Sequence, residues 1–175
     1  MIRSTPLLLV VLASLAVAAP ASTAAGQAVQ RETSIELAVV QQVNTLRVAR
    51  GLRPLRVATG LRAAAFGHTL TLAQLGLFQH ESADGSAFSK RVAKTYRHAG
   101  FGSWSVGENL VFGSAPFAAE DAIQAWLDSP PHRKNLLNPA WREIGVGAVT
   151  AQGAPGVFGG DTVVLVTADF GVRSR

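Results

Sequence analysis

The chain has 175 residues, 16 Lys and Arg against 11 Asp and Glu, a formal charge of +5 at pH 7, and no cysteine. Without cysteine there are no disulfides, thiol nucleophiles or thiolate metal sites, so a metal would have to be held by His, Asp or Glu. The basic residues are scattered and are not interleaved with aromatic residues, which argues against nucleic acid as a partner.

The first 28 residues have the layout of a secretory signal peptide. Arg3 precedes an uncharged apolar run from Leu7 to Ala18, and small residues suited to cleavage follow near residue 21 and near residue 28. The apolar run is shorter than the roughly 20 residues that a spanning helix needs, so we expect no stable membrane anchor. We therefore expect a secreted protein, extracellular or periplasmic.

The rest of the chain predicts a flexible tail over residues 29–35 and one domain over residues 36–173, a size that can bury a core. Apolar residues at steps of three and four, with capping and breaking residues at the ends, predict helices. The helical segments are residues 34–50, 59–75, 88–96, 116–127 and 130–137.

Three segments rich in β-branched residues predict strands. They cover residues 106–112, 143–149 and 162–170, and a Gly- and Pro-rich stretch from 152 to 160 joins the last two as a hairpin-like loop. Helices that flank a small, mainly antiparallel sheet make an α+β fold. The sequence has no internal repeat, and we expect a monomer.

Three polar residues are the candidate site: His80, Glu108 and His132. His80 lies in a non-helical stretch, Glu108 at the mouth of a predicted strand, and His132 near the start of a short helix. Two imidazoles and a carboxylate in one cleft can bind a divalent metal or transfer protons. The structural alternative is that Glu108 pairs with a histidine only to hold loops together.

Two further residues belong to the candidate cleft. Ser129 precedes Pro130 and is a predicted N-cap of the short helix, whose free N–H groups disfavour a charged imidazole at His132. Asp84 begins an Asp-Gly turn and either closes that turn or orients the ring of His80; we favour the turn.

Two familiar enzyme signatures fail in this chain. The segment from His80 to Asp84 begins like an HExxH zinc-protease helix, but it ends in Asp and the following glycine breaks the helix. The segment from Ser103 to Gly107 resembles a GxSxG elbow but lacks the first glycine. These local signatures therefore give no support to an enzyme.

Six short motifs follow one another in chain order. They are Asn44-Xaa-Xaa-Arg47 with Gly51-Leu52-Xaa-Pro54-Leu55; His80-Xaa-Ser82-Xaa-Asp84-Gly85; Gly107-Glu108-Asn109-Leu110; Ala125-Trp126-Leu127-Asp128-Ser129-Pro130-Pro131-His132-Arg133-Xaa-Asn135; Ile144-Gly145-Val146-Gly147; and Asp169-Phe170-Gly171. This order resembles the CAP superfamily, also called the SCP/PR-1-like domain, in its exported bacterial form. The resemblance extends from about Glu36 to Val172.

The resemblance implies a three-layer α-β-α sandwich with a central cleft. Animal and plant members carry two His and two Glu in that cleft, and His80, Glu108 and His132 match three of these positions. The fourth position, a Glu in the family, is Ser129 here. The resemblance therefore implies an incomplete set of ligands, with a divalent cation such as Zn²⁺ as the candidate cofactor at His80, Glu108 and His132.

Three functions remain open from the sequence. The first is an extracellular binding module whose ligand is a lipid, an envelope polysaccharide or a protein, since some family members are associated with sterol or lipid binding. The second is a metal-assisted hydrolase that uses the same cleft, with Glu108 or a histidine taking the proton. The third is a polar staple without chemistry. We favour the binding module.

Overall fold

The structure is a computed structural model that describes residues 27–175. The predicted signal peptide lies outside these residues, apart from its last two positions. The described helices are α1 (Thr33–Val48), α2 (Thr59–Leu75), α3 (Phe88–Thr95), α4 (Ala119–Asp128) and α5 (Pro130–Leu136), with a short 3₁₀ turn η1 (Gly156–Phe158). The strands are β1 (Ala28–Arg31), β2 (Arg56–Val57), β3 (Ser103–Ser114), β4 (Glu143–Gln152) and β5 (Val163–Ser174).

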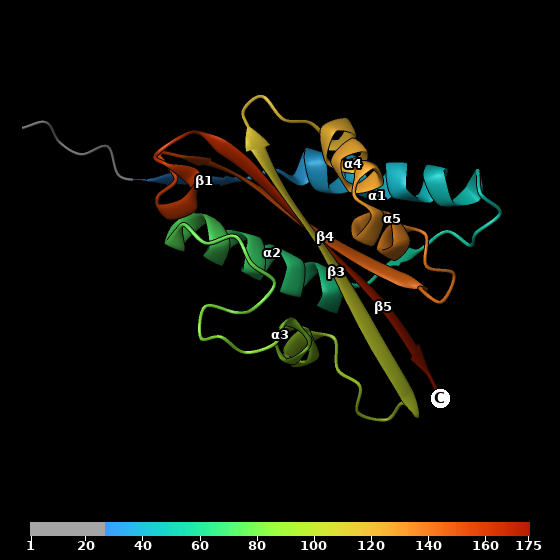
Figure 1. The fold of residues 1–175 in the computed structure, drawn as a ribbon. Helices are drawn as coiled ribbons and strands as arrows, with labels where there is room; N and C mark the ends of the chain where they lie inside the picture. Colours follow the sequence, from blue (N-terminus) through green and yellow to red (C-terminus); the bar gives the residue numbers. More distant parts are fainter. Residues whose placement is uncertain (1–26) are drawn as a thin grey trace, which may run out of the picture.

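The strands form one sheet between two layers of helices (Figure 1). The strand order is β1-β4-β5-β3, all antiparallel, and the short β2 pairs with β4 in parallel. Helices α1, α4 and α5 cover one face, and α2 and α3 cover the other (Figure 1). The predicted α+β sandwich is confirmed. Among the described residues, none of the helices is long and apolar enough to cross a membrane.

The strands β4 and β5, in the middle of the sheet, are buried on both faces, and their sequences are accordingly apolar almost throughout. On the α1–α4 face, Val43, Trp126, Ile144 and Phe170 belong to the largest apolar cluster. Two smaller clusters lie on the other face, under α2 and α3. The core on both faces fixes the register of the strands, because a slip of one residue would turn every apolar side chain to the wrong side.

The helix α2 packs directly on the backbone of β4. A Cβ at Gly147 would lie 2.3 Å from Cα of Phe66, and one at Gly145 would lie 2.0 Å from the backbone nitrogen of Arg62. Real Cβ atoms do not approach backbone this closely, so both positions need glycine for steric reasons. The same approach lets Thr69 donate a hydrogen bond of 2.7 Å to the hydroxyl of Thr167 in β5.

The flexible tail expected at residues 29–35 is wrong. Residues 28–31 form β1, which pairs with β4 from Ala28 opposite Gln152 to Arg31 opposite Val149, and α1 begins at Thr33. The edge of β4 offers unpaired backbone groups that a neighbouring strand satisfies. Arg31 adds two hydrogen bonds of 2.8 Å to the buried carboxylate of Glu36.

The strands β3 and β5 are longer than predicted. They pair over their whole length, from Ser103 opposite Ser174 to Ser114 opposite Val163. The prediction began the first strand at residue 106 because Gly102, Ser103 and Ser105 are typical of loops. The continuous ladder with β5 outweighs this local preference.

The contact between α2 and β4 predicts a large effect of one methyl group. Gly147→Ala is expected to lower the free energy of unfolding by about 3 kcal/mol, since the backbone of α2 would have to move. Gly67→Ala is the matched control, because its Cβ would meet nothing within 4 Å on the exposed side of α2, and it is expected to gain up to about 1 kcal/mol. Urea denaturation measures both; equal effects at the two positions would contradict the close packing.

Candidate functional site

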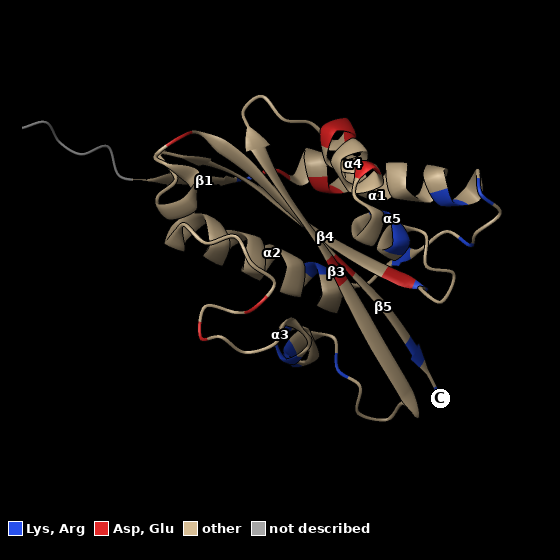
Figure 2. Ribbon diagram, viewed as in Figure 1, with Lys and Arg blue, Asp and Glu red and all other residues tan. Residues whose placement is uncertain are grey.

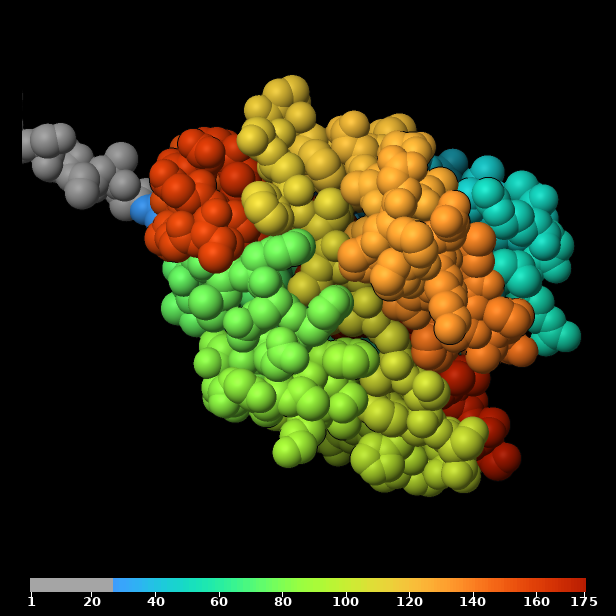
Figure 3. Space-filling model, in the orientation of Figure 1, coloured from blue at the N-terminus to red at the C-terminus, as the bar shows by residue number. Residues whose placement is uncertain are grey.

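The candidate site lies along β3, the last strand in the sheet order, which pairs only with β5. Figure 3 shows this strand on the floor of a groove between the segment that follows α2 and the α4–α5 segment. His80 lies in the segment that follows α2 and contacts Glu108 of β3, and His132 lies at the start of α5, where its carbonyl contacts Asn109 of β3. The three residues predicted from the sequence therefore come from three separate segments, and His80 and His132 each contact β3.

Glu108 is the centre of a polar cluster. Its side chain is only 1% exposed, and Oε1 lies 2.8 Å from Nδ1 of His80. The guanidinium of Arg91, from α3, donates to the other oxygen, and Arg91 also donates a bond of 3.1 Å to the carbonyl of His80. A buried carboxylate needs such partners, because isolated burial of its charge is costly.

His80 is the part of this cluster that meets solvent. Its side chain is 47% exposed, whereas those of Glu108 and Arg91 are 1% and 13% exposed. The hydrogen bond to Glu108 raises the pKa of His80, and it outweighs the opposite effect of partial burial. The imidazolium form, a hydrogen-bond donor on both ring nitrogens, is therefore favoured.

Asp169 lies behind Glu108 and was not predicted as a site residue. It is opposite Glu108 in the β3–β5 ladder and is fully buried. Among the described residues neither carboxylate oxygen of Asp169 has a hydrogen-bond partner. Burial first, and then the negative charge of Glu108, raise the pKa of Asp169 well above its usual range. These surroundings therefore favour the neutral form of Asp169.

Two signals in the sequence bear on the missed residues. Asp169 is the one carboxylate in the apolar run from Val163 to Phe170, and a lone acid in a two-sided buried strand is uncommon. It entered the sequence argument only as part of a family motif. Arg91 gave no comparable signal, because an arginine on a short amphipathic helix is typical of a solvated face.

His132 lies in the first turn of α5. Its Nδ1 lies 2.8 Å from Oγ of Ser129, and its carbonyl accepts a bond of 3.1 Å from the side-chain amide of Asn109 in β3. Burial lowers the pKa of His132, and the nearby charge of His80 lowers it further. His132 is therefore favoured as a neutral imidazole, across the groove from a ring favoured as a cation.

The predicted N-cap position of Ser129 is confirmed, but the capping hydrogen bond is absent. Ser129 is at the N-cap position of α5, but its side chain makes no capping hydrogen bond to the helix. Its hydroxyl is used by His132 instead. Pro130 at the first helical position lacks an N–H, which reduces the need for a cap.

Asp84 lies outside the cluster. It is fully exposed to solvent, and its Oδ1 accepts a bond of 2.9 Å from the N–H of Ser86, as in an Asx turn. The bond to Ser86 lowers the pKa of Asp84.

The core histidine His68 supports the same loop: its Nε2 lies 3.0 Å from the carbonyl of Gln79, directly before His80.

The arrangement does not fit a three-ligand metal centre. Among the described residues there is no group of three or more His, Asp or Glu side chains placed to hold a metal ion. Both oxygens of Glu108 face basic groups, and Nδ1 of His132 faces Ser129. A metal at His80, Glu108 and His132 would have to displace the guanidinium of Arg91 or the ring of His80 from the carboxylate.

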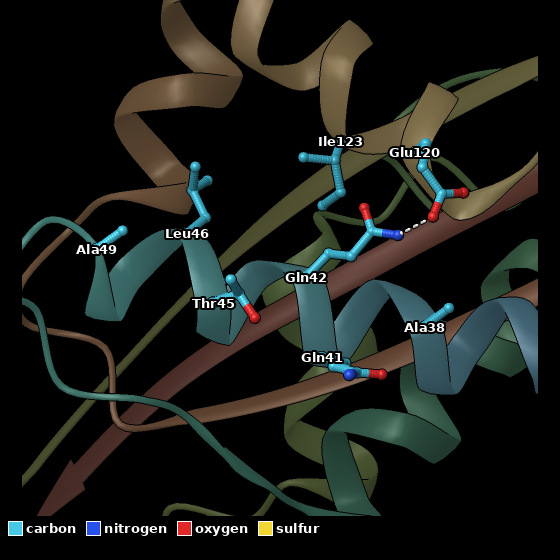
Figure 4. A pocket seen from close by; sticks show the side chains of 8 residues that line it. All are labelled: Ala38, Gln41, Gln42, Thr45, Leu46, Ala49, Glu120 and Ile123. Atoms are coloured by element: carbon cyan, nitrogen blue, oxygen red, sulfur yellow. Dashed lines mark hydrogen bonds between the residues drawn. The ribbon is translucent and has the colours of Figure 1, made fainter.

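A second groove lies between α1 and α4, on the far side of the sheet from Glu108 (Figure 4). Its volume is about 540 Å³, and its lining includes Gln42, Leu46, Glu120 and Ile123. Nε2 of Gln42 donates a bond of 2.5 Å to Glu120 across it. This groove has no histidine, and its carboxylate is already engaged, so it lacks groups for acid–base chemistry.

Comparison with known proteins agrees with the resemblance seen in the sequence. A profile of the CAP family, described as the cysteine-rich secretory protein family, matches residues 40–167. The chain belongs to the CAP family. It has no cysteine, so the described domain is stabilised by its apolar core and polar contacts without any disulfide.

Two curated relatives come from Bacillus subtilis (strain 168). The chain is 32% identical over 118 residues to the uncharacterized protein YkwD, and the matched segment covers 67% of this chain and 43% of YkwD. It is 30% identical over 116 residues to the uncharacterized membrane protein YlbC, covering 66% of this chain and 32% of YlbC. The chain thus matches less than half the length of either relative.

Solved structures share the fold. An extracellular protein containing an SCP domain from Bacillus anthracis str. Ames gives a TM-score of 0.62 at 24% identity, covering 82% of this chain and 41% of that protein. An outer surface protein from Borrelia burgdorferi gives 0.63 at 20% identity, covering 83% of this chain and 98% of that protein. At these identities the likeness concerns the fold alone.

The pair His80–Glu108 predicts a specific titration. In Glu108→Gln the pKa of His80 should fall below its ordinary value of about 6.5, since partial burial and Arg91 then act without the carboxylate. In the unmodified chain, the stability from this pair should be complete below about pH 6.5 and be lost as the pH rises through the raised pKa. NMR titration of the imidazoles measures this, with His98 as internal control; an unchanged pKa of His80 would contradict the assignment.

The raised pKa of Asp169 predicts a loss of stability as the pH rises. Because its folded-state pKa is raised, its contribution becomes unfavourable as the pH rises above the unfolded value of about 3.9. Asp169→Asn, which keeps the shape and removes the acid, should therefore unfold less readily than the parent at neutral pH, with a gap that closes toward about pH 4. Urea titrations across this range measure the gap. A gap of constant size would mean that Asp169 does not titrate against its burial.

Proposed function

We propose that the protein is an exported CAP-domain binding module whose ligand occupies the groove between His80 and His132. The supporting observation is the complementary state of the two rings. Glu108 favours His80 as a cation and donor, while burial favours His132 as a neutral ring that can accept. Among the described residues, no hydrogen bond engages Nε2 of either ring. A polar group of a ligand can therefore bridge the two.

The proposed location is outside the cytoplasm. The N-terminal sequence, with Arg3 before the apolar run from Leu7 to Ala18, supports export. The absence of cysteine removes any need for an oxidising partner in folding. The ligand would then be a component of the extracellular space or envelope: a lipid, a polysaccharide or a protein.

The test uses soluble fragments of envelope components as probes. Glycerol phosphate represents lipid headgroups, and a disaccharide-peptide fragment represents the cell wall. The expected result is that one probe shifts the imidazole NMR signals of His80 and His132 together, and that His80→Gln and His132→Gln each weaken this probe about tenfold or more, since each removes a hydrogen bond to a polar group in a partly desolvated site.

The matched control is His98→Gln, which removes a histidine that packs against Trp104 away from the groove. It should leave the probe affinity unchanged. The proposal fails if no probe shifts the two rings, or if the affinity survives both groove variants.

A hydrolase is the second candidate, and one observation favours it. A histidine whose Nδ1 is held by a carboxylate presents Nε2 as a proton acceptor once it is deprotonated, the geometry used in many acyl-transfer sites. In this case Glu108→Gln should abolish turnover of ester or amide substrates while the probe still binds. Loss of probe binding and turnover together, in a folded variant, would instead favour a binding role for the pair.

A further inference from the structure

One end of the molecule is apolar and exposed. Leu75, Phe78, Phe112 and Val157 are 54%, 40%, 38% and 61% exposed, and these four are the majority of the seven large hydrophobic residues exposed among residues 27–175. We call these four residues the apolar end. Single exposed apolar residues are ordinary, but a contiguous group marks a surface that meets something other than water.

The four side chains form one surface. The rings of Phe78 and Phe112 have centroids 4.8 Å apart, and Phe112 is 5.0 Å from the buried ring of Phe158. The N–H of Val157 donates a bond of 3.0 Å to the carbonyl of Gly76, next to Leu75. The C-terminus of α2, the end of β3 and the turn η1 therefore present a single patch.

The stretches that build the apolar end carry no charge, and the acidic residues Glu81, Glu120 and Asp161 follow directly after them. The three stretches that build it have no Lys, Arg, Asp or Glu: they are residues 71–80, 109–119 and 151–160. Figure 2 shows these stretches without blue or red, while the basic residues colour other parts of the molecule, such as α3 and α5. Apolar and aromatic tips without neighbouring Lys or Arg suit the boundary of a bilayer of uncharged lipid.

The chain also enters the domain at this end. Nε2 of Gln27 donates a bond of 2.6 Å to the carbonyl of Ala73 in α2, and Ala28 pairs with Gln152 next to η1. Only eight residues, 19 to 26, separate Gln27 from the apolar run that ends at Ala18. Eight residues span at most about 30 Å. Before cleavage, an apolar run in the membrane would therefore hold Gln27 within about this distance of the bilayer, with the apolar end facing it.

We propose that the apolar end is a docking surface for the interface of a lipid bilayer. Phe78 and Phe112 enter the boundary between headgroups and acyl chains, with Leu75 and Val157 beside them. The contact is apolar and does not depend on anionic lipid, because the three stretches that form the apolar end contain no Lys or Arg. Phe78 is two residues from His80, so docking would bring one end of the groove to the membrane surface. The docking stands independently of the groove ligand.

The absence of cysteine makes the test direct. A single cysteine is introduced in the full chain at Val157 or, as matched control, at Leu37, which is 62% exposed on α1 away from this end. Each variant, Val157→Cys and Leu37→Cys, is labelled with an environment-sensitive fluorophore and mixed with phosphatidylcholine vesicles. The expected result is a blue shift at position 157 and none at position 37, unaffected by high salt.

A second substitution tests the surface itself. Phe112→Ser in the Val157→Cys background should reduce the fraction of inserted fluorophore about tenfold, since one aromatic side chain no longer leaves water. The proposal is overturned if position 157 shows no shift, if both positions shift equally, or if salt removes the signal. It is also overturned if the shift appears without vesicles and grows with protein concentration, because the surface would then bind a second copy of the chain.

Discussion

The antiparallel ladder between β3 and β5 is the constraint on which the site depends. Its register places Glu108 opposite Asp169, with both side chains on the α2–α3 side of the sheet, and it leaves the other edge of β3 open to the groove. A shift of the register by one residue would turn the carboxylates to the α1–α4 core. The position of the two acids and the position of the groove are thus consequences of a single set of backbone hydrogen bonds.

Burial of two adjacent carboxyl groups is unfavourable unless their charge is reduced or matched. The chain does both. Its surroundings favour the neutral form of Asp169, and the two oxygens of Glu108 contact Arg91 and His80. Because the guanidinium is almost buried and the imidazole is half exposed, the charge of Glu108 is expressed at the surface mainly through the protonation of His80. The buried carboxylate of Glu108 thus favours a positive charge on the half-exposed ring of His80.

Much of the fold follows from the sequence, and the limits of prediction have physical causes. The bounds of helices with clear apolar periodicity and a terminal glycine, such as α2 before Gly76, were predicted accurately, because the periodicity and the glycine are both local signals. The ends of β3 and the existence of β1 were missed, since they depend on pairing with strands that lie far away along the chain. The contact of His80 with Glu108 was expected from the family motifs, whereas Arg91 and the raised pKa of Asp169 depend on burial that only the tertiary structure creates.

The strand β1 lies next to the two cleavage positions that the sequence predicts. It covers the outer edge of β4, and an uncovered edge is a template for pairing with other chains. Cleavage near residue 21 would keep all four of its residues, while cleavage after residue 28 would remove Ala28 and with it one of the four cross-strand pairs. The peptidase that releases the protein would thus also determine how well the sheet is protected against self-association.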